Sequence, residues 1–313
     1  MMALQYGVDA AILFSDILVV PASVYGQELS MPGGVGIRVD NPIRRPSDFA
    51  RLPYNDPQVC LSHVYTAIQQ INSTLSHEGF FSTPLVGFSA APFTLMYFMC
   101  RDREHADHES ASNFMHAFPD DSVAMLQSLE TAVVEYMSAQ VQSGVHAVQL
   151  FEAMGQHISQ KDFETFAQPR LDSIGQRFKA RHPDTPLMLF TRDAMHSLRA
   201  CQRAHYDVLT LDCSVDGAST REYLKQCASE DGLQAPVALQ GNLDPNLLMR
   251  SGDSESDLIA DRACITDRAH ALVDQLGPQG LIANVCGGLT GKEDPELVST
   301  FVSEIQSISF EDR

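Results

Sequence analysis

Seven short apolar runs of strand length recur along the chain, and patterns typical of amphipathic helices lie between them. Val64, Ile68, Ile71 and Leu75, for example, fall on one face of a helix. Alternating strands and helices are the mark of βαβ units, in which consecutive strands run parallel. The sequence therefore predicts an α/β fold. The seven runs are Ala10 to Asp16, Leu85 to Ala90, Ala147 to Glu152, Pro186 to Thr191, Val208 to Asp212, Val237 to Asn242 and Leu281 to Cys286.

The number of runs bears on which parallel-sheet architecture the chain adopts. A TIM barrel has eight β/α units, one more than the sequence shows, whereas an open doubly wound sheet also accommodates seven strands. No Gly-x-Gly-x-x-Gly follows any run, so the dinucleotide-binding version of the open sheet has no support. We therefore predict a TIM-like (β/α)8 barrel whose first strand is missing from this chain. With 44% apolar residues and only two loose stretches, 26–46 and 101–121, residues 1–313 are predicted to form one domain.

Prolines mark several expected helix starts. Asp244 and Asp294 each precede a proline, which places a capping side chain just before the first helical turn. Pro169 interrupts an otherwise helical stretch at 162–180, so we expect a kink or a new helix start there.

Charge and cysteine content narrow the class of protein. The formal net charge of -19 argues against nucleic acid or an anionic membrane as a partner, because both require a basic surface. Seven cysteines without a Cys-x-x-Cys pair fit a reducing compartment better than a disulfide framework. The first residues lack a basic segment, and Asp9 and Asp16 interrupt their apolar run, so neither a signal peptide nor a membrane span is expected. These features predict a cytoplasmic protein.

The first apolar run ends in an acid, Asp16. A run this apolar predicts a strand that is covered on both faces. Asp16 at its end is therefore unusual, because a carboxylate is rarely buried without partners. One interpretation is that Asp16 only caps a neighbouring loop through backbone N–H groups. The other is that Asp16 is a catalytic acid at the C-terminal mouth of a barrel, where β/α barrels carry their functional groups.

Other polar groups also end the predicted strands. Several have a structural explanation: Asp244 is expected to cap a helix, and the glycine pair after the last run allows a tight turn or presents N–H groups to an anion. Cys213 and Cys286 can meet at the mouth, but no further ligands accompany them, so no metal site is predicted. The Gly-x-Ser-x-Gly motif of serine hydrolases is absent from the sequence, so a serine hydrolase is not predicted. The strand-end residues are Asp16, Ser89, Gln149, Glu152, Thr191, Arg192, Asp193, Asp212, Cys213, Gln240, Asn242, Asp244, Asn284, Cys286, Gly287 and Gly288.

Taken in order, these segments resemble the uroporphyrinogen decarboxylase family, the cofactor-free enzymes of haem synthesis. The similarity runs through almost the whole chain, and many ordered matches make it specific. The matching segments are GVDAAILFSDILV at 7–19, NPIR at 41–44, GFSAAPFTLM at 87–96, QLFE at 149–152, LQGNLDP at 239–245, IAN at 282–284 and DPE at 294–296.

The resemblance implies a single distorted (β/α)8 barrel, a homodimer, and removal of carbon dioxide from the four acetate arms of uroporphyrinogen to give coproporphyrinogen. Decarboxylation leaves electrons that a protonated pyrrole can accept. A carboxylate that binds the pyrrole N–H groups stabilises that cation, which is electrostatic preorganisation. Asp16 matches the family's residue for this role. The substrate's eight carboxylates also require cationic or N–H donors, for which arginine is best suited. No cofactor or metal is implied.

The sequence departs from the family pattern at several substrate-binding positions. The family's arginine motif, Arg-Gln-Ala-Gly-Arg, precedes the matched region. Its tyrosine falls at Phe98, with Tyr97 one place earlier, where a one-residue offset points the phenol elsewhere. Its serine or threonine falls at Ala153, and its histidine falls at Gly287.

Three interpretations therefore remain. The first is a decarboxylase whose chain is shortened at the N-terminus, in which Arg44, Arg45 or Arg192 partly replaces the lost cations. The second is a non-catalytic relative that keeps the fold and binds a porphyrinogen or a partner. The third is a zinc-dependent methyltransferase of the same superfamily, whose Gly-Cys-Gly segment resembles residues 285–287. The His-x-Cys pair expected near 191–193 in that group is absent.

Overall fold

The structure is a computed structural model that describes residues 5–14, 16–31, 37–101, 108–277 and 279–308. Contacts divide the chain into two compact units, one of Ile12–His205 and one of Met1–Ala11 with Tyr206–Arg313. That residues 1–313 form a single domain stays a prediction.

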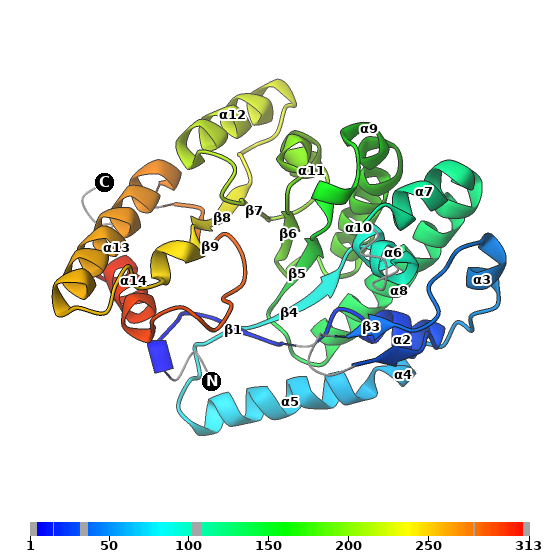
Figure 1. Cartoon of the computed structure of the whole chain (residues 1–313), viewed down its shortest axis with the longest axis horizontal. Coiled ribbons are helices and arrows are strands. Elements are labelled where there is room, and N and C mark those ends of the chain that lie inside the picture. The colour runs from blue at the N-terminus through cyan, green and yellow to red at the C-terminus, as the bar shows by residue number, and fades with distance from the viewer. Residues whose placement is uncertain (1–4, 15, 32–36, 102–107, 278, 309–313) are drawn as a thin grey trace. The chain divides into compact units, whose positions relative to one another are not determined.

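The unit of Ile12–His205 is built on three parallel strands, β4 (Leu85–Ala90), β5 (Ala147–Glu152) and β6 (Leu187–Thr191). Backbone pairing is parallel on both sides of β5, with Phe88 opposite Gln149 and Leu150 opposite Leu189. All residues of β4 and β6 are buried, as expected for strands covered by helices on both faces. Figure 1 shows the three strands side by side, with α8 (Pro119–Gln142) and α10 (Gln168–Arg181) packed close to them.

Two long helices form much of this core. α8 begins with Pro119 and two acidic residues in its first turn, which suit the N-terminal end of the helix dipole. It buries Leu126, Leu129 and Val133 against the sheet and α10. α10 has Pro169 in its first turn, after one turn of π-helix at 163–167, so the new helix start predicted at this proline is confirmed. The unit's other helices are α2 (Val19–Tyr25), α3 (Pro46–Ala50), α4 (Pro57–Cys60), α5 (Ser62–His77), α6 (Pro92–Cys100), α7 (Ser110–Ala117), η1 (Gly155–His157), α9 (Gln160–Asp162), η3 (Met195–Ser197) and α11 (Leu198–Arg203).

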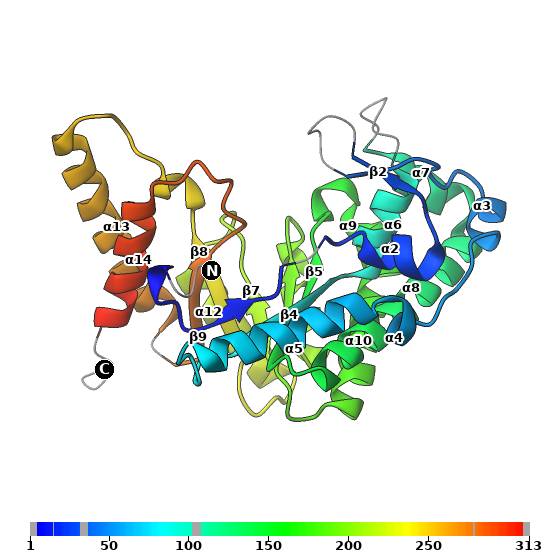
Figure 2. The same ribbon diagram turned by 90° about the horizontal axis from the view of Figure 1, so that it is seen from below.

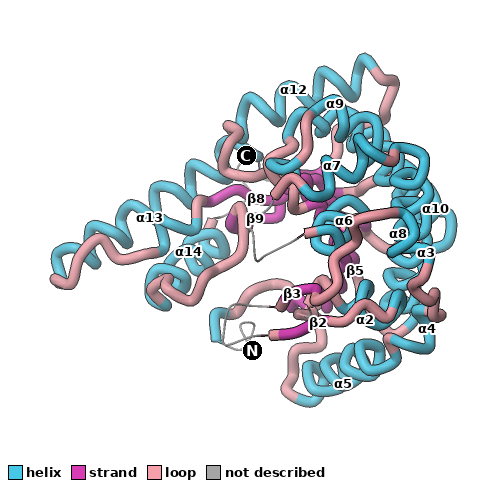
Figure 3. The backbone as a smooth tube through the Cα atoms, turned by 45° about the vertical axis from the view of Figure 1, so that its right-hand side comes forward, coloured by secondary structure: helices cyan, strands magenta, loops and turns pink. Residues whose placement is uncertain are grey.

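The two stretches predicted to be loose contain some regular structure. β2 (Leu29–Ser30) and β3 (Arg38–Val39) pair antiparallel within 26–46, and Figure 3 shows them side by side. The stretch 101–121 includes α7 and the first turn of α8, while 102–107 lies outside the described residues. These elements are too short for a periodic pattern to reveal them.

The second unit has the same plan. Its parallel strands are β7 (Val208–Thr210), β8 (Ala238–Leu243) and β9 (Leu281–Val285). Its helices are α12 (Gly217–Glu230), η4 (Pro245–Leu248), α13 (Glu255–Leu276) and α14 (Pro295–Ser307). The carboxylate of Asp244 accepts a hydrogen bond from Asn246 N, and that of Asp294 from Glu296 N, so both predicted caps are confirmed. Figure 2 shows α13 and α14 side by side.

The first predicted strand is the exception. β1 spans only Ala11–Ile12, and the side chains of Ile12 and Phe14 are 59% and 93% exposed. Buried Leu13 donates its N–H to Val86 O, which places this segment beside β4. The exposure of the Ile12 and Phe14 side chains shows that the prediction of a strand covered on both faces is wrong here. β1 is also an edge strand, with no neighbour beyond it among the described residues. The other six predicted runs each contain a strand.

Within the residues that the structure describes, no helix is both long enough and apolar enough to cross a membrane.

Candidate active site

α6 crosses the C-terminal end of β5. The helix follows β4 directly: Ala91 is extended, donates its N–H to Phe151 O at 2.8 Å, and precedes a proline that starts the helix. The Thr94 hydroxyl then donates to the carboxylate of Glu152 and accepts the N–H of Ala153 at 2.8 Å. One threonine therefore fixes α6 to the strand end at which β/α proteins carry their catalytic groups.

Glu152 is fully buried at this strand end. Burial raises the pKa of Glu152 to about 8, although the Thr94 hydroxyl and the N–H groups of Phe93 and Thr94 oppose the shift. Its Oε2 has no hydrogen-bond partner in the described part of the chain. Glu152 is therefore a neutral acid at pH 7 that links β5 to α6, and its burial keeps it from contacting a bound molecule.

Beyond Thr94, three aromatic rings stack together. The Tyr97 hydroxyl and His108 Nδ1 are hydrogen-bonded at 2.6 Å. The His157 ring stacks against both, with centroids 4.9 Å from Tyr97 and 4.6 Å from His108 and interplanar angles of 12° and 9°. The guanidinium carbon of Arg101 lies 5.6 Å from the centre of the Tyr97 ring, within cation–π range. We call these four residues the Tyr-His cluster.

The Tyr-His cluster brings the Arg101 guanidinium and two imidazole rings together in an acidic chain. Burial lowers the pKa of His157, and the charges of His108 and Arg101 lower it further, against the opposing carboxylate of Asp193. Asp193 follows β6 and has a left-handed backbone with φ 57°. Gly155 lets this turn approach, because a Cβ there would collide with the carbonyl oxygen of Arg192. Sequence analysis missed His108, His157 and Arg101, although His157 follows the strand-end Glu152 by only five residues.

Asp16 lies in the same unit, after β1, but its surroundings differ from those predicted. The residue is exposed, so the prediction of a carboxylate at the end of a buried strand is wrong. Oδ1 accepts the N–H of Leu18 at 2.7 Å, and the carbonyl accepts the N–H of Val19 at 3.3 Å. Asp16 therefore caps the turn that leads into α2, as the structural interpretation expected. The catalytic role of Asp16 stays a prediction.

Two of the other predicted positions come together. Phe98 is half-buried, follows Thr94 by one helical turn, and packs edge-on against Tyr97 at 5.3 Å. Ala153 is half-buried and hydrogen-bonded to Thr94 through its N–H. Gly287 belongs to the other compact unit, where it follows β9. Their roles in binding stay predictions.

A disulfide joins Cys213 to Cys286 after β7 and β9, with Cα atoms 5.6 Å apart. The cysteine pattern favoured a reducing compartment over a disulfide framework, and this pair departs from that expectation. Parallel strands end at one edge of a sheet, so residues 73 apart in sequence come within bonding reach across β8. Near them, Asn242 donates its amide N–H groups to the carbonyls of Asp212 and Val215 at 2.9 and 3.0 Å, which assigns this side chain a structural role.

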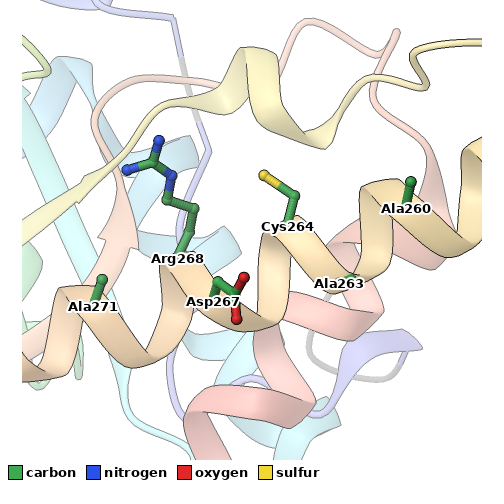
Figure 4. A pocket seen from close by; sticks show the side chains of 6 residues that line it. All are labelled: Ala260, Ala263, Cys264, Asp267, Arg268 and Ala271. Carbon is green, nitrogen blue, oxygen red and sulfur yellow. The ribbon is translucent and has the colours of Figure 1, made fainter.

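Two hollows occur in this second unit. One, of about 350 Å³, is lined by Cys213, Asp216, Asn242 and Arg268 among others. The other, of about 620 Å³, lies along one face of α13, and Figure 4 shows Cys264 and Arg268 pointing to the same side of the helix. Alanines make up half of the lining residues, so few polar groups converge there. In the described part of the chain, no three His, Cys, Asp or Glu side chains are grouped to hold a metal ion.

The parallel strands, their helical crossovers and the polar groups at their C-terminal ends define an α/β protein of the TIM-like class. A methyltransferase from Methanosarcina mazei has the same fold, with a TM-score of 0.75 over 97% of this chain and 82% of that one at 16% identity. The predicted fold class is thereby confirmed. The chain belongs to the uroporphyrinogen decarboxylase (URO-D) family, whose profile matches residues 1–308.

Curated relatives support this family membership. Uroporphyrinogen decarboxylase of Salinibacter ruber is 32% identical over 305 residues, which cover 97% of this chain and 79% of the relative. The human enzyme is 33% identical over 313 residues, which cover 97% of this chain and 78% of the relative. The family resemblance inferred from the sequence is thus confirmed, and it implies a decarboxylase-type enzyme.

Proposed function

We propose that this protein is a uroporphyrinogen decarboxylase of porphyrin and haem biosynthesis, a carboxy-lyase that converts the four acetate arms of uroporphyrinogen to methyl groups and yields coproporphyrinogen. The observation that carries the proposal is the family match over residues 1–308. In this proposal the enzyme is a cytoplasmic homodimer, uses no cofactor or metal, and binds neither nucleic acid nor a membrane.

Asp16 is the proposed catalytic residue. Its Oδ1 is held by the N–H of Leu18, which fixes the carboxylate at the turn. Its Oδ2 has no hydrogen-bond partner among the described residues, and the side chain is exposed. A fixed, accessible carboxylate oxygen suits binding to pyrrole N–H groups, where it stabilises the protonated ring that accepts the electrons of the breaking carbon–carboxylate bond. Each released carbon dioxide is replaced by a proton at the methylene carbon.

A second candidate function is that of a non-catalytic relative. Phe98, Ala153 and Gly287 stand where the family resemblance implies a phenol, a hydroxyl and an imidazole. These positions therefore supply no polar side chain to the substrate. A protein of this kind binds a porphyrinogen without turning it over.

The test is an anaerobic assay with freshly reduced uroporphyrinogen, in which products are separated by their number of carboxylates. We expect products with seven down to four carboxylates from the wild type. Asp16→Asn should lower the rate roughly a hundredfold or more, as removal of a transition-state partner does. Asp184→Asn, which removes an equal charge from an exposed site, is the matched control. A folded wild type without turnover would refute the proposal and support the non-catalytic relative.

A further inference from the structure

The Tyr-His cluster has features of a binding site for an anion. We propose that Arg101, His108 and His157, framed by the Tyr97 ring, bind one carboxylate arm of the tetrapyrrole substrate. This inference rests on the proposed function and identifies residues that would serve its substrate. The Tyr-His cluster is proposed to bind the substrate, whereas Asp16 is proposed to act in the chemical step.

The position of the cluster supports this inference. Tyr97 follows Thr94 by three residues on α6, and Thr94 is fixed to the end of β5 through Glu152 and Ala153. His157 lies on η1, just past the same strand end. The cluster therefore contacts Phe98 through Tyr97 and lies one helical turn from the threonine that binds Ala153. The family resemblance places Phe98 and Ala153 in contact with substrate.

The charges of the cluster also call for an anionic partner. Arg101 supplies a guanidinium cation, and its Nε is buried without a hydrogen-bond partner among the described residues. Arg101 as a whole is only half-buried, so part of the residue stays accessible to a carboxylate oxygen. A carboxylate bound here would be attracted by the Arg101 charge, which already lowers the pKa of His157.

The chemistry of the substrate fits this arrangement. The net charge of -19 repels a molecule with eight carboxylates, so a substrate of this class needs local cationic donors. Arginine can donate two parallel N–H groups to a carboxylate, and the stacked imidazoles add N–H donors when protonated. The flat stack of Tyr97, His157 and His108 restricts their motion, so little conformational freedom is lost on binding.

The test measures binding separately from turnover. Uroporphyrinogen is incubated with the protein anaerobically at low temperature in phosphate-free buffer, and the retained tetrapyrrole is quantified by ultrafiltration and sorted by carboxylate number. Arg101→Met and His157→Gln are each expected to weaken retention about tenfold, which corresponds to ~1.4 kcal/mol. Arg101→Lys should recover part of the loss, because it keeps the charge but loses the fork of donors.

Two matched control variants carry the same kinds of substitution at other positions. Arg181→Met, at the end of α10, breaks a surface ion pair with Glu135 of α8, and His63→Gln lies on the exposed face of α5. Both control variants should retain uroporphyrinogen within about twofold of wild type if binding depends on the Tyr-His cluster in particular. Thermal unfolding of each variant checks that it is folded.

Retention in Arg101→Met and His157→Gln equal to that of the controls would overturn the subsite. So would a folded wild type that retains no uroporphyrinogen. Retention that falls in both variants, without products of lower carboxylate number from the wild type, would support the subsite and refute the decarboxylase.

Discussion

Glu152 makes the folding stability of this protein depend on pH in a direction opposite to that of most acids. Its pKa rises from 4.5 in the unfolded chain to about 8 in the folded protein, because the carboxyl is buried. Between these two values the folded state holds a proton that the unfolded state has lost. The free energy of unfolding contributed by Glu152 is therefore greatest below pH 4.5 and is lost as the pH rises through 8.

The size of the effect follows from the difference between the pKa values of the folded and unfolded states. A pKa difference of one corresponds to about 1.4 kcal/mol, so the full effect is roughly 5 kcal/mol. Between pH 5.5 and 8 it amounts to roughly 3 kcal/mol. Glu152→Gln removes the titration while keeping an oxygen that accepts the Thr94 hydroxyl. The variant should therefore gain stability relative to wild type as the pH rises.

The assay is urea unfolding of wild type and Glu152→Gln at pH 5.5, 7 and 8.5, which yields the difference in the free energy of unfolding at each pH. Other titrating groups cancel in that difference. Glu78→Gln, at an exposed position after α5, should show no divergence from wild type. Parallel curves for Glu152→Gln and wild type would refute the assignment of a neutral, buried Glu152.

Two further predictions concern single contacts. Thr94→Val should lower the free energy of unfolding by roughly 2 kcal/mol in urea at pH 7, because Glu152 and the Ala153 N–H each lose a partner; a change below about 0.5 kcal/mol would contradict the role of Thr94. A thiol assay on the unreduced, denatured protein should detect only five thiols, those of Cys60, Cys100, Cys201, Cys227 and Cys264. Breaking the disulfide should lower the free energy of unfolding by about 4 kcal/mol, given its 73-residue separation. Seven thiols without reductant would exclude the disulfide.

Much of the fold followed from local patterns. All seven apolar runs predicted as strands contain one, because composition and length are properties of the segment itself. The caps at Asp244 and Asp294 and the helix start at Pro169 were predictable for the same reason, since a cap or a proline acts within one turn. Family membership also followed, because its motifs are contiguous in the sequence.

The exposure of side chains in the first apolar run could not be predicted from the sequence. Its apolar composition predicts cover on both faces, but cover depends on which segments lie beside a strand. In the structure Phe14 and Asp16 are exposed, and β1 has a neighbouring strand on one side only among the described residues. The capping contact of Asp16 with Leu18 was within reach of sequence analysis because it spans two residues.

The sequence by itself determined the order of strands and helices, their boundaries at prolines and capping acids, and the family. Only the tertiary structure decided which distant side chains meet. Tyr97 and His157 stack across sixty residues because α6 folds back over the end of β5, and Cys213 reaches Cys286 because parallel strands share an edge. Periodicity and capping act over a few residues, whereas these contacts depend on how whole elements pack, and packing is not encoded at any one position.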